Sequence, residues 1–150
     1  EVGTYTGYSA LCMSEGLKAN GVIHTIDINE EHASIAQKYF NRSTYAKNIT
    51  QHTGNALDVI PKLECNFQLA FIDADKENYS TYFDLIIAKM DISGYIIADN
   101  VLWSGKVTKE QKDEETEALD FYNKKVLADP RVETILLPIR DGLMVSRKIK

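Results

Sequence analysis

Two clusters of polar side chains carry the residue types that bind a divalent cation. The first cluster contains Asp73, Asp75 and Lys76, and the second contains Asp99 and Asn100. Each directly follows an apolar run typical of a buried strand, and ligands bind at the carboxyl ends of such strands in open α/β sheets. Oxygen ligands without histidine or cysteine favour Mg²⁺, Ca²⁺ or Mn²⁺ over Zn²⁺. We therefore predict an open metal site at Asp73, Asp99 and Asn100; the alternative is that these acids cap helices or solubilise loops.

Lys76 lies beside the predicted metal site, at the start of a pattern typical of an amphipathic helix. The helix dipole disfavours a cation in the first turn, so a lysine at this position favours a chemical role. Such a lysine could accept a phenolic proton once a metal has polarised the oxygen. The alternative is a solvated surface lysine whose stem packs against the protein. Asp75 could cap the same helix or contact a cofactor.

A second group of residues predicts a nucleoside site. Gly3 and Gly7 flank a tight loop between a strand and a helix, where missing side chains let a ligand approach the backbone and the helix amides. Asp27 ends the next predicted strand, where a carboxylate can accept both hydroxyls of a ribose. The dinucleotide fingerprint Gly-x-Gly-x-x-Gly is absent, because the bulky Tyr5 stands two positions after Gly3. A nucleoside without phosphates therefore fits better than a dinucleotide.

Three further residues are candidates for cofactor contact, and each has a structural alternative. Glu1 stands at the entrance of the loop, where a carboxylate repels pyrophosphate but suits a ligand with an ammonium and a sulfonium. It could instead support the loop through hydrogen bonds to nearby amides. Ser9 could contact the cofactor or be an ordinary residue of a first helical turn. Ala56 could let an adenine pass, or it could simply begin a helix.

The elements that must position these residues alternate along the chain. Apolar runs predict strands, and apolar residues at three- and four-residue steps predict helices. The alternation predicts an α/β fold with a mostly parallel, doubly wound sheet, and the short last connection predicts one antiparallel strand in a C-terminal hairpin. The predicted strands cover residues 22–27, 48–53, 67–72, 92–98, 132–137 and 143–146, and the predicted helices cover residues 8–20, 29–41, 55–63, 79–90 and 109–128.

Composition narrows the class of protein. A chain of 150 residues with 44% hydrophobic and 26% charged residues fits one globular domain over residues 1–150. A net charge of -5 disfavours a partner made of nucleic acid or an anionic membrane surface. Cys12 and Cys65 have neither metal-binding nor disulfide spacing, and no stretch is long and apolar enough to cross a bilayer. We therefore expect a cytoplasmic protein with a small-molecule partner.

Together these residues resemble the cation-dependent O-methyltransferases of the caffeoyl-CoA and catechol type. The resemblance spans nearly the whole chain and is carried by residues 1–9, Asp27, residues 73–79 and residues 99–103, with residues 137–143 similar to the family's final hairpin. It implies a Rossmann-like class I methyltransferase fold. It also implies further helices and a longer first strand before Glu1, and a homodimer.

The resemblance implies a role for each matching residue. S-adenosylmethionine would be held by Glu1, Gly3, Thr4, Ser9, Asp27, Ala56 and Asp75, the metal by Asp73, Asp99 and Asn100, and the substrate by Asp73, Trp103 and Ser104. Lys76 would be the general base, with Asp73 also catalytic, in methyl transfer to an aromatic vicinal diol such as caffeoyl-CoA, a catechol or a flavonoid. Two alternatives are a non-catalytic module that binds S-adenosylmethionine and an NAD-dependent oxidoreductase.

Overall fold

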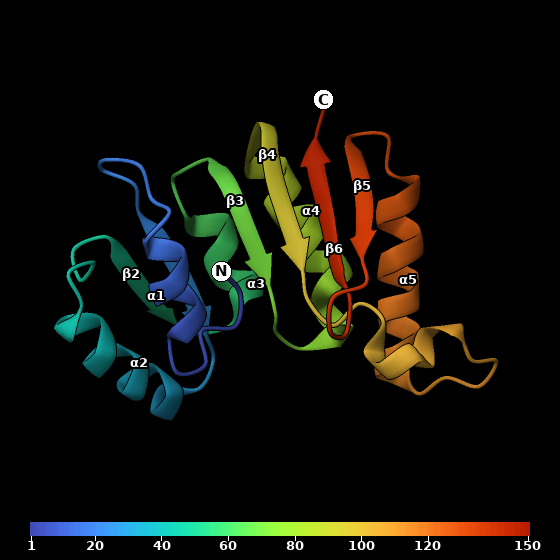
Figure 1. Cartoon of the computed structure of the whole chain (residues 1–150), viewed down its shortest axis with the longest axis horizontal. Coiled ribbons are helices and arrows are strands. Elements are labelled where there is room, and N and C mark those ends of the chain that lie inside the picture. The colour runs from blue at the N-terminus through green and yellow to red at the C-terminus, as the bar shows by residue number, and fades with distance from the viewer. The chain divides into compact units, whose positions relative to one another are not determined.

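The computed structural model describes all 150 residues, and the chain divides into two compact units, Glu1–Lys62 and Leu63–Lys150. Both units combine strands with helices (Figure 1), which confirms the predicted α/β class. None of the helices has the length and apolar character needed to cross a membrane.

The first unit is built on a pair of parallel strands, β1 and β2, whose residues Ile23 and Ile49 are paired. Side chains from two helices, Ala10, Ala36 and Phe40, form its buried apolar cluster. The elements of this unit are α1 (Tyr8–Ser14), β1 (Ile23–Asp27), α2 (Glu30–Arg42), β2 (Ile49–Thr53), α3 (Ala56–Val59) and the 3₁₀ turn η1 (Ile60–Lys62).

The second unit is built on a four-stranded sheet with strand order β3-β4-β6-β5. Strands β3 and β4 are parallel, whereas β6 runs antiparallel to both of its neighbours. A mostly parallel arrangement with one antiparallel strand in the last hairpin is therefore confirmed. Its elements are β3 (Phe67–Ile72), η2 (Lys76–Asn78), α4 (Tyr79–Lys89), β4 (Met90–Ala98), η3 (Trp103–Thr108), α5 (Glu114–Ala128), β5 (Val132–Leu137) and β6 (Leu143–Lys148).

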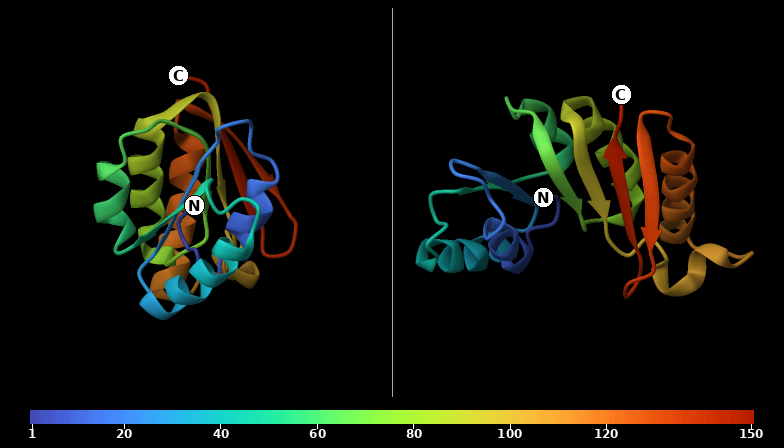
Figure 2. Two further views of the ribbon diagram at one scale, coloured as in Figure 1. Left: turned by 90° about the vertical axis from the view of Figure 1, so that its left-hand side faces the viewer. Right: turned by 45° about the horizontal axis from the view of Figure 1, so that its top comes forward.

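Helices α4 and α5 cover one face of this four-stranded sheet (Figure 2). Alternate strand residues such as Ile72 and Ile96 point to that side and are almost completely buried. On the opposite face, which Figure 1 turns toward the viewer, Ile97, Val145 and Ile135 are cross-strand neighbours. Ile135 is 57% exposed, so this apolar part of the second face is only partly covered within the unit.

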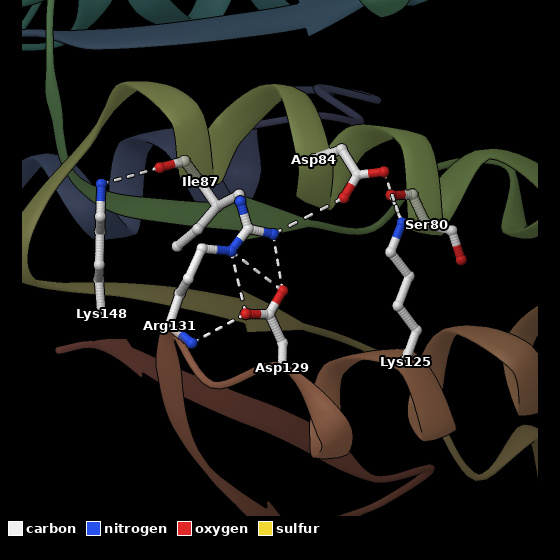
Figure 3. Close-up of polar contacts among 7 residues, drawn as sticks. All are labelled: Ser80, Asp84, Ile87, Lys125, Asp129, Arg131 and Lys148. Atoms are coloured by element: carbon white, nitrogen blue, oxygen red, sulfur yellow. Dashed lines mark hydrogen bonds and ion pairs between the residues drawn. The ribbon is translucent and has the colours of Figure 1, made fainter. Parts of the chain in front are cut away.

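Polar contacts fasten α4 to its surroundings, as Figure 3 shows. The ammonium of Lys125, on α5, donates to the carboxylate of Asp84 and to the carbonyl of Ser80, both on α4. The ammonium of Lys148, on β6, donates to the carbonyl of Ile87 at 3.0 Å, near the end of α4. Cations suit this end of a helix because its last carbonyls have no partner within the helix.

Three helices begin where the sequence supplies a capping side chain. The side-chain oxygen of Asn29 accepts from two amides of α2, and that of Asn55 accepts from an amide of α3. Asp113 accepts from the amide of Thr116 and so begins α5 at Glu114. The prediction that this helix starts at residue 109 was therefore wrong, because an N-cap fixes where helical hydrogen bonding begins.

Other predicted bounds also differ from the structure: β4 begins at Met90 instead of residue 92, β6 ends at Lys148 instead of residue 146, and α3 ends at Val59 instead of residue 63. The first helix ends at Ser14 instead of residue 20. At this end the Ser14 hydroxyl donates back to the carbonyl of Ala10. Gly16 follows two residues later, and serine and glycine both weaken a helix. Residues 103–108, predicted as loop, form the irregular 3₁₀ segment η3.

Candidate functional site

Residues 1–3 run parallel to β1 and bring Glu1 beside that strand. Val2 forms a parallel bridge with Ile26, and the Gly3 amide donates to the carbonyl of Ile26 at 2.9 Å. Gly7 then closes the loop in a left-handed conformation with φ of 86°. A Cβ on Gly7 would lie 2.6 Å from the ring of Phe40, so the loop can pack on α2 only with glycine at this position.

The Glu1 carboxylate accepts hydrogen bonds from the hydroxyls of Ser9 and Thr25. The Thr25 hydroxyl also lies 2.6 Å from that of Thr4, and both threonines are buried. The supporting role considered for Glu1 is therefore present, but its partners are hydroxyls rather than amides. Thr25 was missed by the sequence analysis, and a threonine inside an otherwise apolar strand is the signal that could have found it.

Asp27 lies at the end of β1 as predicted, and its carboxylate is fixed by the backbone. Its two oxygens accept from the amides of Tyr5 at 2.7 Å and Asn29 at 2.8 Å. The carbonyl of Asp27 accepts from the amide of Gly54 at 2.9 Å, which brings the start of α3 beside it. Ala56 is the buried first residue of α3, so the helix-start interpretation holds for its backbone, and its contact with adenine stays a prediction.

In the second unit, Asp73 and Asp99 follow paired strand residues. Ile72 and Ala98 are register partners at the ends of β3 and β4, and the Asp99 amide donates to the Ile72 carbonyl at 3.0 Å. The two acids therefore leave the same edge of the sheet side by side, as the apolar runs before them predicted. This edge is the carboxyl end of both strands, where ligands bind in parallel sheets.

Lys76 is buried between side-chain oxygens, with only 7% of its surface exposed. Its nitrogen lies 3.1 Å from Asp73 Oδ1 and 3.1 Å from Asn100 Oδ1. The alternative of a solvated surface lysine was therefore wrong. Lys76 also precedes α4 in the 3₁₀ turn η2 instead of lying in the first turn of α4 itself.

The donor set at this edge fits a hard divalent cation. The Lys76 ammonium already brings a positive charge within hydrogen-bonding distance of Asp73 and Asn100, so oxygens of both residues face one point. The chain has no group of three His, Cys, Asp or Glu side chains placed closely enough to hold a metal ion by themselves. A cation beside Lys76 would therefore need the Asn100 amide oxygen together with the carboxylates of Asp73 and Asp99.

Tyr79 completes the surroundings of Lys76 and was not assigned chemistry from the sequence. Its hydroxyl accepts from the Lys76 ammonium at 2.6 Å and donates to the carbonyl of Asp99 at 3.1 Å. Burial, and then the charges of Asp73 and Asp99, raise the pKa of Tyr79 far above its usual value, so it stays a neutral hydroxyl. Its position three residues after Lys76, on the same side of a helical turn, is the signal that could have found it.

Asp75 does not cap a helix, which corrects one of its two interpretations. Its carboxylate accepts from the hydroxyl of Tyr82 at 2.6 Å and from the side-chain amide of Asn78, and it receives no backbone amide. Burial, and then this hydrogen bond, raise the pKa of Tyr82. Contact between Asp75 and a cofactor stays a prediction.

The segment with Trp103 and Ser104 is held by the turn of the last hairpin. Both residues have left-handed backbones, with φ of 46° and 53°, and the Ser104 amide donates to Asp141 Oδ1 at 2.5 Å. The Lys76 nitrogen lies 5.6 Å from the centre of the Trp103 ring. Trp103 therefore borders the lysine, whereas Ser104 lies exposed beside it, and contact of either residue with a substrate stays a prediction.

Comparisons with known proteins agree with this geometry. The family model described as O-methyltransferase matches residues 1–149. The caffeoyl-CoA O-methyltransferase of Mesembryanthemum crystallinum is 35% identical over 162 aligned residues, which cover 99% of this chain and 64% of that enzyme. The chain thus spans less than two thirds of the length of that relative.

Solved structures show the same fold. The O-methyltransferase of Bacillus cereus, in complex with SAH, superimposes with a TM-score of 0.92 at 28% identity, covering 98% of this chain and 71% of that one. The SAH-bound methyltransferase of Podospora anserina gives a TM-score of 0.89 at 27% identity, covering 99% and 70%. The fold is therefore the Rossmann-like fold of class I methyltransferases. Because the family model matches residues 1–149 and a relative with this activity in its name is 35% identical, the chain belongs to the O-methyltransferase family.

Proposed function

We propose that this chain transfers a methyl group from S-adenosylmethionine to one hydroxyl of an aromatic vicinal diol, in a reaction that needs a divalent cation. The observation that carries the proposal is the buried Lys76 amine, held by oxygens of Asp73 and Asn100 at the ends of two paired strands. The relatives named caffeoyl-CoA O-methyltransferases support an acceptor of the caffeoyl-CoA type, and we include catechols and flavonoids because they carry the same vicinal diol.

Residues of the first unit would hold most of the methyl donor. When bound, S-adenosylmethionine supplies a methyl group activated by its positive sulfonium. The Glu1 carboxylate would face the positively charged end of the donor, since Ser9 and Thr25 already fix its orientation. The Asp27 carboxylate would accept the ribose hydroxyls with the lone pairs that its two backbone amides leave free. Gly3, Thr4, Ser9, Ala56 and Asp75 would complete the cofactor contacts.

Residues of the second unit would prepare the acceptor. Asp73, Asp99 and Asn100 would hold Mg²⁺, or Ca²⁺ or Mn²⁺ in its place, and such a cation supplies Lewis acidity that favours ionisation of a hydroxyl. Lys76 would accept the hydroxyl proton at Nζ, so that the oxygen is free to attack the methyl group. Trp103 would lie against the aromatic ring of the acceptor. Ser104 and Asp73 would also contact the acceptor.

The proposal extends to the state of the protein in the cell. We expect a cytoplasmic homodimer with a small-molecule substrate and no nucleic acid or membrane partner, and the net charge of -5 supports the absence of a nucleic-acid or anionic-membrane partner. Sedimentation of the purified protein measures the oligomeric state, and a monomer at all concentrations would contradict the dimer.

Methylation of a catechol with and without a chelator tests the proposed reaction. Incubation with S-adenosylmethionine should give a methylated product that disappears with EDTA and returns with excess Mg²⁺. A monohydric phenol is the matched acceptor, and it should react at least about 100-fold more slowly because it cannot chelate a cation. Equal methylation of both acceptors, unaffected by EDTA, would contradict the metal-dependent mechanism.

Replacement of Lys76 separates an enzyme from a binding module. Lys76→Met should lower kcat by about 100-fold or more, the usual size of a general-base contribution, and leave the affinity for S-adenosylhomocysteine unchanged. The control is Lys124→Met, because Lys124 is 75% exposed on α5. If the parent protein binds S-adenosylhomocysteine but no acceptor turns over, the binding module is the better interpretation. If calorimetry shows that NAD binds and S-adenosylhomocysteine does not, the oxidoreductase is the better interpretation.

A further inference from the structure

The Lys76 ammonium has three N–H groups and three oxygen atoms within hydrogen-bonding distance. Its nitrogen lies 2.6 Å from the Tyr79 hydroxyl and 3.1 Å from each of the side-chain oxygens of Asp73 and Asn100. An ammonium carries three N–H donors and no acceptor, so these contacts account for all of them. A buried ammonium in this state loses a hydrogen bond if any one partner is removed.

Tyr79 differs from the other two partners of Lys76. Asp73 and Asn100 are two of the three residues proposed to hold the cation, and an oxygen that binds a cation is a poorer acceptor for an ammonium. Tyr79 has no such second task. It is 0% exposed, and its hydroxyl donates toward the carbonyls of Asp99 at 3.1 Å and Ile72 at 3.4 Å, which leaves an oxygen lone pair for Lys76.

The ring of Tyr79 is held as firmly as its hydroxyl. It meets the ring of Tyr122, on α5, edge to face with 5.5 Å between the centroids. Pairs of aromatic rings have a preferred geometry, and close packing in a protein interior leaves a ring few other orientations. The Tyr79 oxygen is therefore a fixed point against which the long, flexible lysine side chain can be held.

We propose that Tyr79 is a positioning residue that holds the Lys76 nitrogen where it accepts the proton of the acceptor hydroxyl. This inference rests on the proposed function. In the step concerned, the O–H bond of the acceptor breaks and its proton bonds to the lone pair of neutral Lys76. The freed oxygen pair forms the new bond to the methyl carbon, and the C–S bond breaks to leave a neutral thioether.

Tyr79 neither gains nor loses a proton in that step. Neutral Lys76 has two N–H groups and one lone pair, and the ammonium formed from it has three N–H groups. One N–H can point at the Tyr79 oxygen in both states, which leaves the lone pair on the side of Asp73 and Asn100. Without the Tyr79 hydroxyl, the amine can rotate away, and small misplacements of reacting groups cost large factors in rate.

Tyr79→Phe tests this role, with Tyr122→Phe as the matched control. Both tyrosines are buried, but the Tyr122 hydroxyl has no hydrogen-bond partner. Tyr79→Phe should lower kcat for catechol by about 10- to 100-fold and leave the KM for catechol and the affinity for S-adenosylhomocysteine unchanged. Tyr122→Phe should keep the parent kcat. Equal losses in the two variants would overturn the proposal.

An acidic acceptor distinguishes positioning of a base from general damage. The hydroxyl of 4-nitrocatechol ionises in water near neutral pH, so its methylation needs little help from Lys76. The deficit of Tyr79→Phe should therefore shrink to about twofold with 4-nitrocatechol, because loss of general-base assistance no longer matters. A deficit of the same size with both acceptors would show a structural role and overturn the inference.

Chemical labelling of Lys76 gives a readout that does not require methyl transfer. An amine-specific reagent, followed by peptide mass spectrometry at one pH, should label Lys76 in the parent far more slowly than the exposed Lys124. In Tyr79→Phe the rate at Lys76 should rise several-fold, whereas Tyr122→Phe should match the parent. Parent Lys76 labelled as fast as Lys124, or labelled at an unchanged rate in Tyr79→Phe, would overturn the proposal even if no acceptor is methylated.

Discussion

The Lys76 nitrogen lies 3.1 Å from the side-chain oxygen of Asn100, a residue 24 positions further along the chain. This contact exists because β3 and β4 end side by side. Asn100 has a left-handed backbone with φ of 60°, a conformation that asparagine tolerates better than most residues. The identity of residue 100 is therefore constrained twice, by its backbone and by its side-chain oxygen.

Substitutions of Asn100 separate these two constraints. Asn100→Gly and Asn100→Ala both remove the oxygen, so both should lose most methyl transfer. Only alanine opposes the left-handed backbone, so Asn100→Ala should be less stable than Asn100→Gly by about 1 kcal/mol. Urea unfolding of the two variants measures the difference in the free energy of unfolding. Equal stability would show that the backbone at residue 100 relaxes.

Replacement of Asp27 should weaken binding of the methyl donor. Both oxygens of Asp27 accept backbone amides, and an asparagine side chain at this position could accept only one of them. Asp27→Asn should lower the affinity for S-adenosylhomocysteine by about tenfold or more, the equivalent of one hydrogen bond to a charged group. Isothermal calorimetry measures this, with Glu30→Gln on the exposed start of α2 as control. Unchanged affinity in Asp27→Asn would remove Asp27 from the proposed ribose site.

Two neighbouring lysines on α5 should differ in their contribution to stability. Lys125 bridges to Asp84 and Ser80 on α4, as Figure 3 shows, whereas Lys124 contacts only Asp120 on its own helix. Lys125→Met should lower the free energy of unfolding by about 0.5–1 kcal/mol, and Lys124→Met should change it by less than about half of that. Chemical unfolding at low and high salt checks both values, since salt should weaken the Lys125 contribution. The reverse order would contradict a bridge between the helices.

The N-cap of α5 should make stability depend on pH in acid. Hydrogen bonds from Thr116 lower the pKa of Asp113 to about 2, against an ordinary value of 3.8. Because the folded-state pKa is depressed, the contribution of the charged cap is complete above about pH 4 and is lost as the pH falls toward about 2.

Asp113→Asn tests this dependence, because asparagine also caps helices but does not ionise. The parent should have a higher melting temperature than Asp113→Asn. The difference should be largest above about pH 4 and should shrink toward about pH 2. Thermal unfolding between these limits measures it, and Glu110→Gln, an acid before the helix, controls for the loss of one charge. A difference that stays constant with pH would contradict the role of the Asp113 charge.

The sequence predicts the parts of this molecule that depend on neighbours along the chain. The bounds of β3 and β5 agree with the predicted ranges, because each is a strand-like run between clear breaks. The burial of Lys76 could not be predicted, since Asn100 reaches it only through strand pairing. Tyr79 fits an apolar helix position equally well, and its hydroxyl acquires a role only when the Asp99 carbonyl lies beside it.

The pairing of β3 with β4 is uneven along its length. Phe67 is paired with Met90, but Leu69 is paired with Tyr95, so β4 has extra residues near its start, where Ser93 has φ of 69°. From Leu69 to Ile72 the pairing is regular. Insertions and deletions in homologues should therefore be tolerated before Tyr95, where the irregular segment can absorb them, and excluded between Tyr95 and Asp99, where each would carry Asp99 away from Asp73.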